Sequence, residues 1–553
     1  MFYPVLLTIP IAGYGLLLLG WHLLRRVLLS KNSGLLELPL LAKGRSSAQK
    51  IPGTAVICGG SIAGLLAARV CHDHFERVLV VETEPWVSSE DGSRLDGWNQ
   101  TRQRSRVMQF TSLHMSQSFV YEAMKYMFPN LEEECRRSDI SIAPYNPHIA
   151  LSGACVLGPR SYRDFPRAIF ASRMGTDILQ AVNRRLVLDK AAYPDIEFLT
   201  GTVNDVKPNP TDHSRLSTVV VRTESGIQEV EAALVADCTG PARAGLKWLQ
   251  RHGYGLSNSS TYPSGALPLD QLKISIDQKL RYTSITFNDI SPERYDSLPW
   301  PPHLPGLKRR LYSFSEDGGE ESIANGRRVF MLLRGDGQHL CVFAGHYGTR
   351  QPQPNNMAEM KMYIRGMNTR KPMPDWIFKI LDMLEEHEVK ASVSALRVGP
   401  TTYVQYHRAV NLPSNYVALG DSVMNGIEGA AKATRCALSL HKTLYGALKT
   451  SKNALPTDFS IKFFSESYNK TDWTWQNTRI ADYGMPTTEP IAGESLSSGA
   501  FMRRYGTHMQ RLSTTDELVG WAMYNIIVGM SSPIDALHPH IVLKVLWSMF
   551  WSR

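Results

Sequence analysis

Cysteine is scarce in this sequence and scattered along it. The seven cysteines among 553 residues form no Cys-x-x-Cys pair, which argues against a zinc cage or a disulfide framework and favours a reducing compartment. The chain also lacks a long lysine and arginine run with interleaved aromatic residues, so we expect no nucleic-acid partner. A hydrophobic content of 43% instead predicts a large globular core, and the net charge of +9 favours anionic surfaces or phosphate-bearing cofactors.

One run looks like a metal-binding cluster. Cys71, His72, Asp73 and His74 follow one another at the predicted end of a helix. A metal site needs ligands from a second segment, and none accompanies this run. We therefore interpret the run as a solvated helix terminus and predict no metal.

The N-terminal segment lacks charged side chains. From Phe2 to Leu24 there is no Asp, Glu, Lys or Arg, over a length close to the roughly 20 apolar residues that cross a bilayer. Arg25 and Arg26 follow, so the positive-inside rule places the body of the protein in the cytosol. We expect a single-pass membrane anchor, in the endoplasmic reticulum. A cleaved signal peptide is the alternative, but its basic start and small-x-small cleavage site are missing.

Two hydrophobic patterns predict the fold class. The apolar run Thr54–Cys58, a glycine turn, a helix over Leu65–His72 and the apolar run Arg77–Glu82 are typical of a βαβ unit with buried parallel strands. The runs Arg328–Arg334 and Leu340–Gly345 indicate an antiparallel hairpin. We predict an α/β protein: a Rossmann-like domain with an inserted antiparallel sheet, an N-terminal transmembrane helix and a helical C-terminal region.

The turn of this βαβ unit carries the clearest chemical motif. Gly59 allows a tight turn, and Gly64 lets the helix pack on the strand, so the helix N-terminus meets a pyrophosphate. Gly60 and Ser61 lie between them, with Ser61 replacing the usual middle glycine and adding a hydroxyl donor. Glu82 follows 18 residues after Gly64, where a carboxylate suits ribose hydroxyls. The pattern predicts a dinucleotide site, and a glycine turn without a ligand is the alternative.

Two distant segments make a resemblance specific. Ala236–Gly240 resembles the DATG segment, and Leu419–Ser422 the GD segment, of FAD-dependent monooxygenases, in matching order and spacing. The chain is most similar to the epoxidase and hydroxylase branch, with bacterial polyether epoxidases and fungal terpenoid and meroterpenoid monooxygenases. Further counterparts are Val107-x-Gln109, His114, Phe165–Arg167, Ser172–Arg173, Gly335–Gly337 and Val528–Pro533. The resemblance extends from Thr54 to about Pro539.

The resemblance implies a set of FAD-binding residues. They are Gly59, Gly60, Ser61, Gly64, Glu82, Arg173, Asp237, Gly240, Gly420 and Asp421. The glycine turn would hold the pyrophosphate, Glu82 the adenosine ribose, Arg173 the phosphates or ribityl edge, and Asp421 the ribityl hydroxyls. Asp421 also suits the cap of the following helix, and it could serve both purposes.

One loop departs from the family pattern. Where the family has Pro-x-x-Gly-x-Gly over the flavin ring, this chain has the segment from Glu428 to Ala433. Without a gap, Ala431 and Ala433 occupy the two glycine positions. A two-residue gap restores Gly429 to the first position, but Ala431 still holds the second. Alanine methyl groups at these positions would crowd backbone donors. Lys432 would either stabilise negative charge on reduced flavin or lie exposed at the start of a helix.

The resemblance also implies the chemistry. NADPH or NADH, docking transiently, would reduce FAD, and molecular oxygen would be the co-substrate, so no catalytic side chain is required. An apolar terpenoid or polyketide intermediate of secondary metabolism would be epoxidised or hydroxylated. The alternatives are a flavin-dependent reductase or dehydrogenase of prenyl chains, and a non-redox flavoprotein scaffold or cyclase-like protein. The sequence leaves the oligomeric state open.

The C-terminal region has two apolar segments, Val519–Val528 and Ile541–Trp551, too short to span a bilayer. They either lie on a membrane or pack on the protein's own core. The predicted division of the chain is anchor 1–29, linker 30–50, FAD-binding parts 51–125, 166–250 and 391–450, substrate-domain parts 126–165 and 251–390, and C-terminal helices 451–553.

Overall fold

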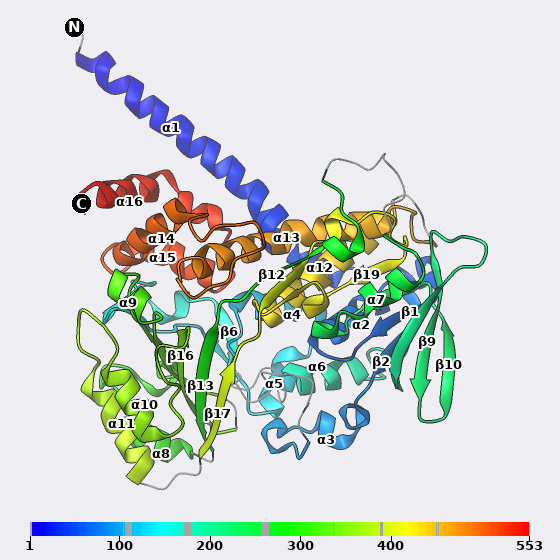
Figure 1. The fold of residues 1–553 in the computed structure, drawn as a ribbon, viewed down its shortest axis with the longest axis horizontal. Helices are drawn as coiled ribbons and strands as arrows, with labels where there is room; N and C mark the ends of the chain where they lie inside the picture. The colour runs from blue at the N-terminus through cyan, green and yellow to red at the C-terminus, as the bar shows by residue number, and fades with distance from the viewer. Residues whose placement is uncertain are drawn as a thin grey trace.

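The computed structural model (Figure 1) describes most of the chain. The described residues are 3–102, 104, 113–170, 179–255, 265–288, 290–335, 337–386, 391–449, 451 and 453–551. Strands and helices mix in an α/β arrangement, which confirms the predicted class at that level. Arg173, Val107 and Gln109 lie outside the described residues.

The first sheet is parallel and has five strands. In spatial order they are β19 (Tyr416–Ala418), β11 (Leu234–Asp237), β1 (Ile51–Cys58), β2 (Phe75–Glu82) and β7 (Ile196–Thr200). Every pairing is parallel, and the predicted runs lie within β1 and β2. The last five residues of β1 and of β2 are buried, as expected for strands covered on both faces.

Helix α2 (Ile62–His72) connects β1 to β2. All residues from Gly64 to Cys71 are buried, because α2 packs between this sheet and the long helix α12 (Gly429–Ala447). Its small side chains allow this close packing. The predicted βαβ unit is therefore confirmed.

Strand β1 lies at the point where the strand order reverses. The chain continues from β1 to β2 and β7 on one side, and later adds β11 and β19 on the other. In open parallel sheets, ligands bind outside the carboxyl ends of the strands at such a point. The fold thus directs attention to the loops that follow β1 and β11.

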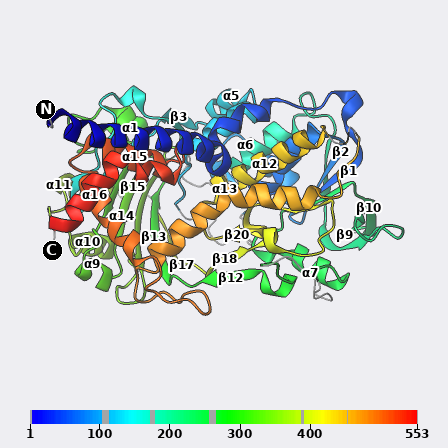
Figure 2. The same ribbon diagram turned by 90° about the horizontal axis from the view of Figure 1, so that it is seen from above.

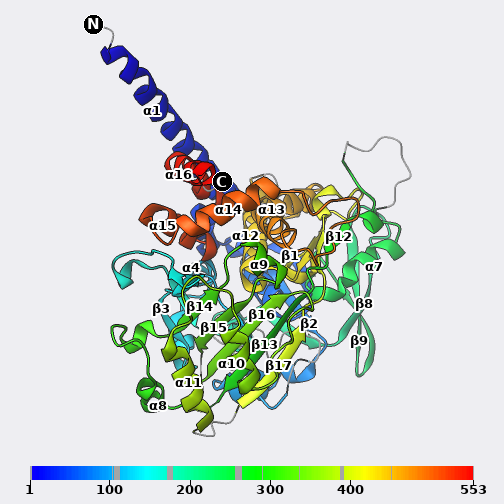
Figure 3. The same ribbon diagram turned by 60° about the vertical axis from the view of Figure 1, so that its left-hand side comes forward.

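A second, mixed sheet has seven strands (Figure 3). In order they are β17 (Ala391–Arg397), β13 (Leu280–Phe287), β16 (Leu340–Tyr347), β15 (Val329–Arg334), β14 (Leu311–Ser315), β4 (Ile149–Leu151) and β5 (Ala154–Cys155). The pairing of β15 with β16 is antiparallel and confirms the predicted hairpin. Helices α10 (Met357–Arg365) and α11 (Asp375–Glu386) share a hydrophobic cluster with these strands.

Smaller sheets and further helices complete the structure. The sheets are β8 (Thr202–Pro208), β9 (Leu216–Thr223) and β10 (Gly226–Glu231); β12 (Lys273–Ile276), β18 (Thr401–Val404) and β20 (Met424–Asn425); and β3 (Ser141–Pro144) with β6 (Arg167–Phe170). The longer helices are α4 (Ser118–Met127), α6 (Leu179–Leu188), α7 (Ala244–Arg251), α13 (Phe459–Asp482), α14 (Ala500–Leu512), α15 (Glu517–Ile527) and α16 (Pro539–Trp551).

The segment predicted as a linker is packed on the body. Leu38 and Leu41, in the 3-10 helix η2 (Leu35–Ala42), are buried in the main core. Arg45 is also buried, and its guanidinium donates to His74 Nδ1 (3.2 Å) and to the Leu444 carbonyl (2.9 Å). Residues 35–45 are therefore part of the folded body rather than a spacer.

The interpretation of the Cys71–His74 run as a solvated helix terminus is wrong at His74. His74 is fully buried, and its Nε2 lies 3.2 Å from Nδ1 of His441 on α12. Burial, with His441 and Arg45 adding their charges, lowers the pKa of His74 well below its usual value. The end of α2 therefore lies inside the protein, because His441 of the distant helix α12 contacts His74.

The predicted single-pass anchor is wrong. Helix α1 spans Tyr3–Leu28, but within the described part of the chain no helix has both the length and the apolar character for a membrane crossing. This finding removes the basis for the predicted endoplasmic-reticulum localisation. Some of the described side chains of α1 contact the C-terminal region. Trp21 Nε1 donates to the Ile534 carbonyl (3.1 Å), and Arg25 forms a two-pronged ion pair with Asp535 (2.6 and 2.9 Å).

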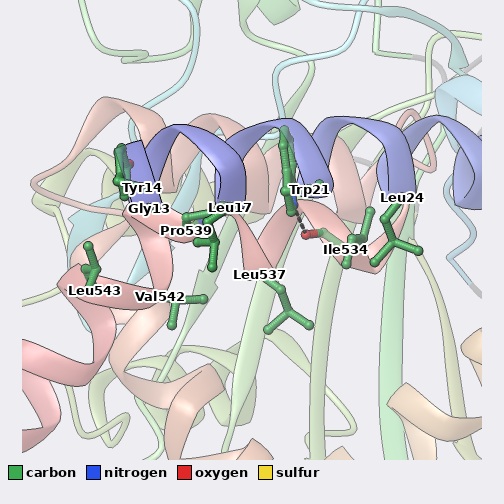
Figure 4. A pocket seen from close by; sticks show the side chains of 11 residues that line it. Gly13, Tyr14, Leu17, Trp21, Leu24, Ile534, Leu537, Pro539, Val542 and Leu543 are labelled. Carbon is green, nitrogen blue, oxygen red and sulfur yellow. Dashed lines mark hydrogen bonds between the residues drawn. The ribbon is translucent and has the colours of Figure 1, made fainter. Parts of the chain in front are cut away.

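Helix α1 runs beside α16 and the 3-10 helix η12 (Pro533–Leu537) (Figures 1 and 2). An apolar groove of about 520 Å³ lies between them (Figure 4). The groove is lined by Gly13, Tyr14, Leu17, Gly20, Trp21, Leu24, Ile534, Leu537, Pro539, Val542 and Leu543. The region that was predicted to cross a membrane thus faces protein along part of its surface.

The apolar C-terminal helices have two different faces. Val519 of α15 with Ile541 and Val545 of α16 are buried in a small core with α14. The opposite face of α16 leaves Trp547 and Phe550 about two-thirds exposed. Of the two interpretations of this region, packing on the protein's own core therefore accounts for the inner face.

A buried carboxyl group joins the seven-stranded sheet to these helices. Asp482, the last residue of α13, is 3% exposed and accepts a hydrogen bond from the hydroxyl of Tyr347 at the end of β16 (3.1 Å). Burial raises its pKa to about 7, against a partly opposing effect of the Tyr347 hydrogen bond. The folded protein therefore binds this proton more tightly than the unfolded chain does.

The raised pKa predicts a pH-dependent stability. The stabilising contribution of protonated Asp482 is complete below about pH 4 and is lost as the pH rises through about 7. Asp482→Asn keeps an oxygen acceptor for Tyr347 but removes this ionisation. Because one pKa unit corresponds to about 1.4 kcal/mol, we expect D482N to be about 2–4 kcal/mol more stable than the wild type near pH 8 and similar to it near pH 4. Thermal unfolding across this pH range measures the difference.

Asp458 provides the control. Its carboxyl group lies at the other end of α13, is half-exposed and pairs with Lys462 (2.7 Å). D458N is expected to keep the wild-type pH dependence. An equal pH response in D482N and the wild type would contradict the assignment.

Candidate dinucleotide site

The site begins with the tight turn after β1. Gly59 has a φ of +122°, a backbone conformation that favours glycine, and its N–H donates to the Val81 carbonyl (2.8 Å). A Cβ atom at Gly59 would lie 2.3 Å from the carbonyl oxygen of Cys238, which follows β11. The loops after β1 and β11 are therefore in direct backbone contact at the point where the strand order reverses.

Gly64 brings α2 against this turn. A Cβ atom at Gly64 would lie 1.8 Å from the Gly59 carbonyl oxygen, so only glycine allows the helix to approach. Ser61 is the N-cap residue of α2, and its carbonyl accepts the first helical hydrogen bond from Leu65 (2.9 Å). The N-terminal end of α2, with its positive dipole, is thus positioned at the sheet edge as a phosphate site requires.

Glu82 ends the neighbouring strand and is nearly buried. Its Oε2 accepts hydrogen bonds from the Gly60 N–H (2.8 Å) and from Arg104 (3.0 Å), and its Oε1 accepts one from the Glu84 N–H (3.1 Å). Arg104 also bonds the Glu84 carboxylate (2.6 Å). Glu82 is therefore held at the edge of the glycine turn, where a ribose of a dinucleotide would lie.

Asp237 is fully buried at the end of β11. Its Oδ1 accepts hydrogen bonds from Thr239 N–H (2.9 Å), Thr239 Oγ1 (2.7 Å) and Ser422 Oγ (3.0 Å). Its Oδ2 accepts bonds from Gly245 N–H (3.1 Å) and the Tyr416 hydroxyl (3.3 Å). Asp237 therefore shapes the sheet edge rather than facing a ligand. Gly240, with φ of +67°, donates to Ser422 Oγ (3.0 Å).

The loop after β19 completes the site. Gly420 has φ of +63°, and a Cβ atom there would lie 2.6 Å from the Cβ atom of Ala63 on α2. Asp421 lies in the short 3-10 helix η11 (Gly420–Ser422), and its side chain is 39% exposed. It does not cap α12, because the residue at that position is Glu428. Its Oδ1 accepts a hydrogen bond from Lys432 (2.6 Å).

Lys432 is buried, so the expectation of an exposed helix-start lysine is wrong. It is 2% exposed, and its ammonium also donates to the carbonyls of Met424 and Ile427 (3.1 Å to the latter). Sequence analysis missed this burial. The alanines on both sides of Lys432 were the signal, since they mark a buried first turn of α12.

Glu428 precedes α12 in an unusual backbone conformation. Its φ is +40°, and its carboxylate bonds Arg435 (2.6 Å) and the Gln117 amide (3.0 Å). Arg435 is buried between the rings of Phe119 and Trp473, 4.7 and 4.9 Å from their centroids. The segment that departs from the family pattern is thus held by an ionic and aromatic cluster.

The structure brings nine of the ten predicted residues to one edge of the five-stranded sheet. They are Gly59, Gly60, Ser61, Gly64, Glu82, Asp237, Gly240, Gly420 and Asp421. The tenth, Arg173, lies outside the described residues. Arg104 and Ser422, which contact Glu82 and Asp237, were not predicted. Arg104 has no local pattern that would identify it.

These residues fit the diphosphate and ribose of FAD. The turn leaves no space for a Cβ atom at Gly59 or Gly64, and a helix N-terminus and a carboxylate flank it. The assignment of FAD to this edge is a prediction from the cradle and its donor set.

Comparisons with known proteins gave likenesses to flavin-dependent enzymes. No protein-family model and no curated protein sequence matches the chain. Among solved structures, p-nitrophenol 4-monooxygenase PnpA from Pseudomonas putida is 14% identical, with 88% of this chain and 99% of that chain covered and a TM-score of 0.49. The flavin-dependent halogenase CmlS is 13% identical, with 83% and 72% covered and a TM-score of 0.48.

A third likeness is to a geranylgeranyl bacteriochlorophyll reductase-like protein from Thermoplasma acidophilum. It is 13% identical, with 90% of this chain and 100% of that chain covered and a TM-score of 0.42.

The contact of Gly64 with Gly59 makes a sharp prediction. Gly64→Ala places a methyl group 1.8 Å from a backbone oxygen, so α2 must move away from the turn. We expect a loss of about 3 kcal/mol or more of stability and no measurable FAD binding. Thermal unfolding and titration with FAD measure the two effects.

Gly446, near the end of α12, is the matched control. A Cβ atom there meets nothing within 4 Å, so G446A is expected to be neutral or stabilising by up to about 1 kcal/mol. FAD binding by G64A with wild-type affinity would show that this turn is not the cofactor site.

Proposed function

We propose that this protein is an FAD-dependent monooxygenase that uses NADPH or NADH and molecular oxygen. The observation that carries the proposal is the backbone cradle after β1, closed by Gly59 and Gly64 and flanked by Glu82, at the reversal point of a parallel sheet. This combination is typical of dinucleotide cofactor sites.

Within this proposal each residue has a role toward the cofactor. The N–H groups at the start of α2 bind the diphosphate, and Glu82 accepts hydrogen bonds from ribose hydroxyls. Asp237 holds the loops after β11 and β19 together, and Asp421 accepts hydrogen bonds from the ribityl chain. FAD supplies the electron transfer and oxygen chemistry when bound. The protein positions it and keeps water away from it.

The proposed substrate is an apolar terpenoid or polyketide intermediate, which would be epoxidised or hydroxylated. The support for this finer step is the resemblance to the epoxidase and hydroxylase branch. A transiently docked nicotinamide would supply the electrons.

A second candidate is a flavoprotein scaffold or cyclase-like protein that binds the same ligands without redox turnover. The observation that favours it is the segment from Glu428 to Ala433. Ala431 and Lys432 stand where the family has backbone that approaches the flavin ring, and both are buried. Turnover therefore has to be tested separately from FAD binding.

The first experiment is the visible spectrum of the purified full chain, before and after NADPH is added without oxygen. We expect the visible absorption of bound flavin before NADPH is added, because the cradle holds FAD. We expect this absorption to bleach afterwards, because NADPH reduces the flavin. Readmission of isotopically labelled dioxygen with polyene substrates should then give labelled product. The G64A variant serves as the negative control.

The outcomes separate the candidates. Folded protein without flavin would contradict the proposed function. Bound flavin that no nicotinamide reduces, with or without substrate, would favour the scaffold. Product that is saturated or desaturated without labelled oxygen would favour a reductase or dehydrogenase.

A further inference from the structure

Lys432 has an unusual environment for a lysine. Its ammonium group is buried and has three acceptors: the Asp421 carboxylate (2.6 Å) and the carbonyls of Ile427 (3.1 Å) and Met424. An ammonium has three N–H donors, so each donor has a partner. A buried charge is costly unless it is paired and hydrogen-bonded, so this arrangement indicates a specific role.

The three acceptors belong to one short segment. Asp421 lies in η11, shortly after β19, while Met424 begins the short strand β20 and Ile427 lies between β20 and α12. Lys432 itself is in the first turn of α12, and its backbone N–H donates to the Glu428 carbonyl (2.8 Å). One side chain therefore fastens the Asp421 loop to the start of α12.

The two ends of the ion pair differ in exposure. Lys432 is 2% exposed at its side chain, whereas Asp421 is 39% exposed. The lysine thus approaches Asp421 from inside the protein, and the carboxylate reaches solvent on its other side. This is the arrangement expected of a buried cation that orients a ligand-binding carboxylate.

We propose that Lys432 is a positioning residue for FAD, which acts through Asp421 and sets both the affinity and the reduction potential of the flavin. The proposal rests on the proposed function of the site. Without the lysine, the Asp421 carboxylate loses its counter-charge. The segment Met424–Ile427 also loses the hydrogen bonds that hold it to α12. The uncompensated negative charge would disfavour the more negative reduced flavin.

The test compares Lys432→Met with Lys470→Met. Lys470 on α13 is equally buried and is paired with Glu37 (2.7 Å) and Glu466, so its replacement breaks a comparable ion pair away from the proposed site. We expect both variants to lose thermal stability. Only K432M is expected to bind FAD at least tenfold more weakly and to hold it at a lower reduction potential.

Two further variants keep the test decisive. Lys432→Gln can still donate to the carboxylate and carbonyls but is neutral, so it should fold and show the lowered potential. Asp421→Asn combined with K432M removes both charges and should return the potential toward the wild-type value. Additive effects of the two substitutions would show that Lys432 does not act through Asp421.

The result also separates this inference from the proposed function. Failure of the folded wild-type protein to bind FAD would overturn both. Wild-type affinity and potential in K432M or K432Q, in a wild-type protein that does bind FAD, would overturn the role of Lys432 alone.

Discussion

The buried Asp237 carboxylate is the interaction on which the proposed site depends. It accepts five hydrogen bonds, from two groups of Thr239, from Ser422, from Gly245 and from Tyr416. These donors come from two segments that are far apart in the sequence: Thr239 and Gly245 follow β11, whereas Tyr416 and Ser422 lie in and after β19. A hydrogen bond to a charged group contributes about 1.5–3 kcal/mol, and a buried carboxylate that loses its donors is strongly destabilising. The loops after β11 and β19 therefore keep one relative position, which fixes the edge that Gly59 and Asp421 share.

Local chemistry explains why much of this edge could be predicted. The turn needs a φ of +122° at Gly59, and the contact at Gly64 leaves no room for a Cβ atom. Both positions therefore require glycine, and this requirement is visible in the sequence. Buried parallel strands such as β1 and β2 likewise appear as apolar runs, since both faces are covered. The position of Glu82 follows from the length of α2 and the pairing of its two flanking strands.

Contacts between distant segments could not be predicted in this way. The hydropathy of α1 describes its composition but not what covers it, and its partners Ile534 and Asp535 lie more than 500 residues away. His74 was interpreted as solvated because its partner, His441, lies on another helix. The burial of Arg104 beside Glu82 has the same origin.

The segment between η11 and α12 shows how a departure from a family pattern can still be well packed. Where the ungapped family pattern has glycines, the chain has Ala431 and Ala433. Glu428 adopts a left-handed conformation that costs about 1–3 kcal/mol for a residue other than glycine. That cost is offset by the bonds of Glu428 to Arg435 and Gln117. A glycine loop would hold this segment through backbone groups. Here the buried ammonium of Lys432 holds it through side-chain hydrogen bonds. At the edge of the proposed site, the Glu428 carboxylate is therefore bonded by Arg435 and Gln117, and the Lys432 ammonium by three acceptors. Together with the turn at Gly59, these contacts hold the edge in one arrangement, which the proposed cofactor site requires because its backbone donors must be in place before a ligand binds.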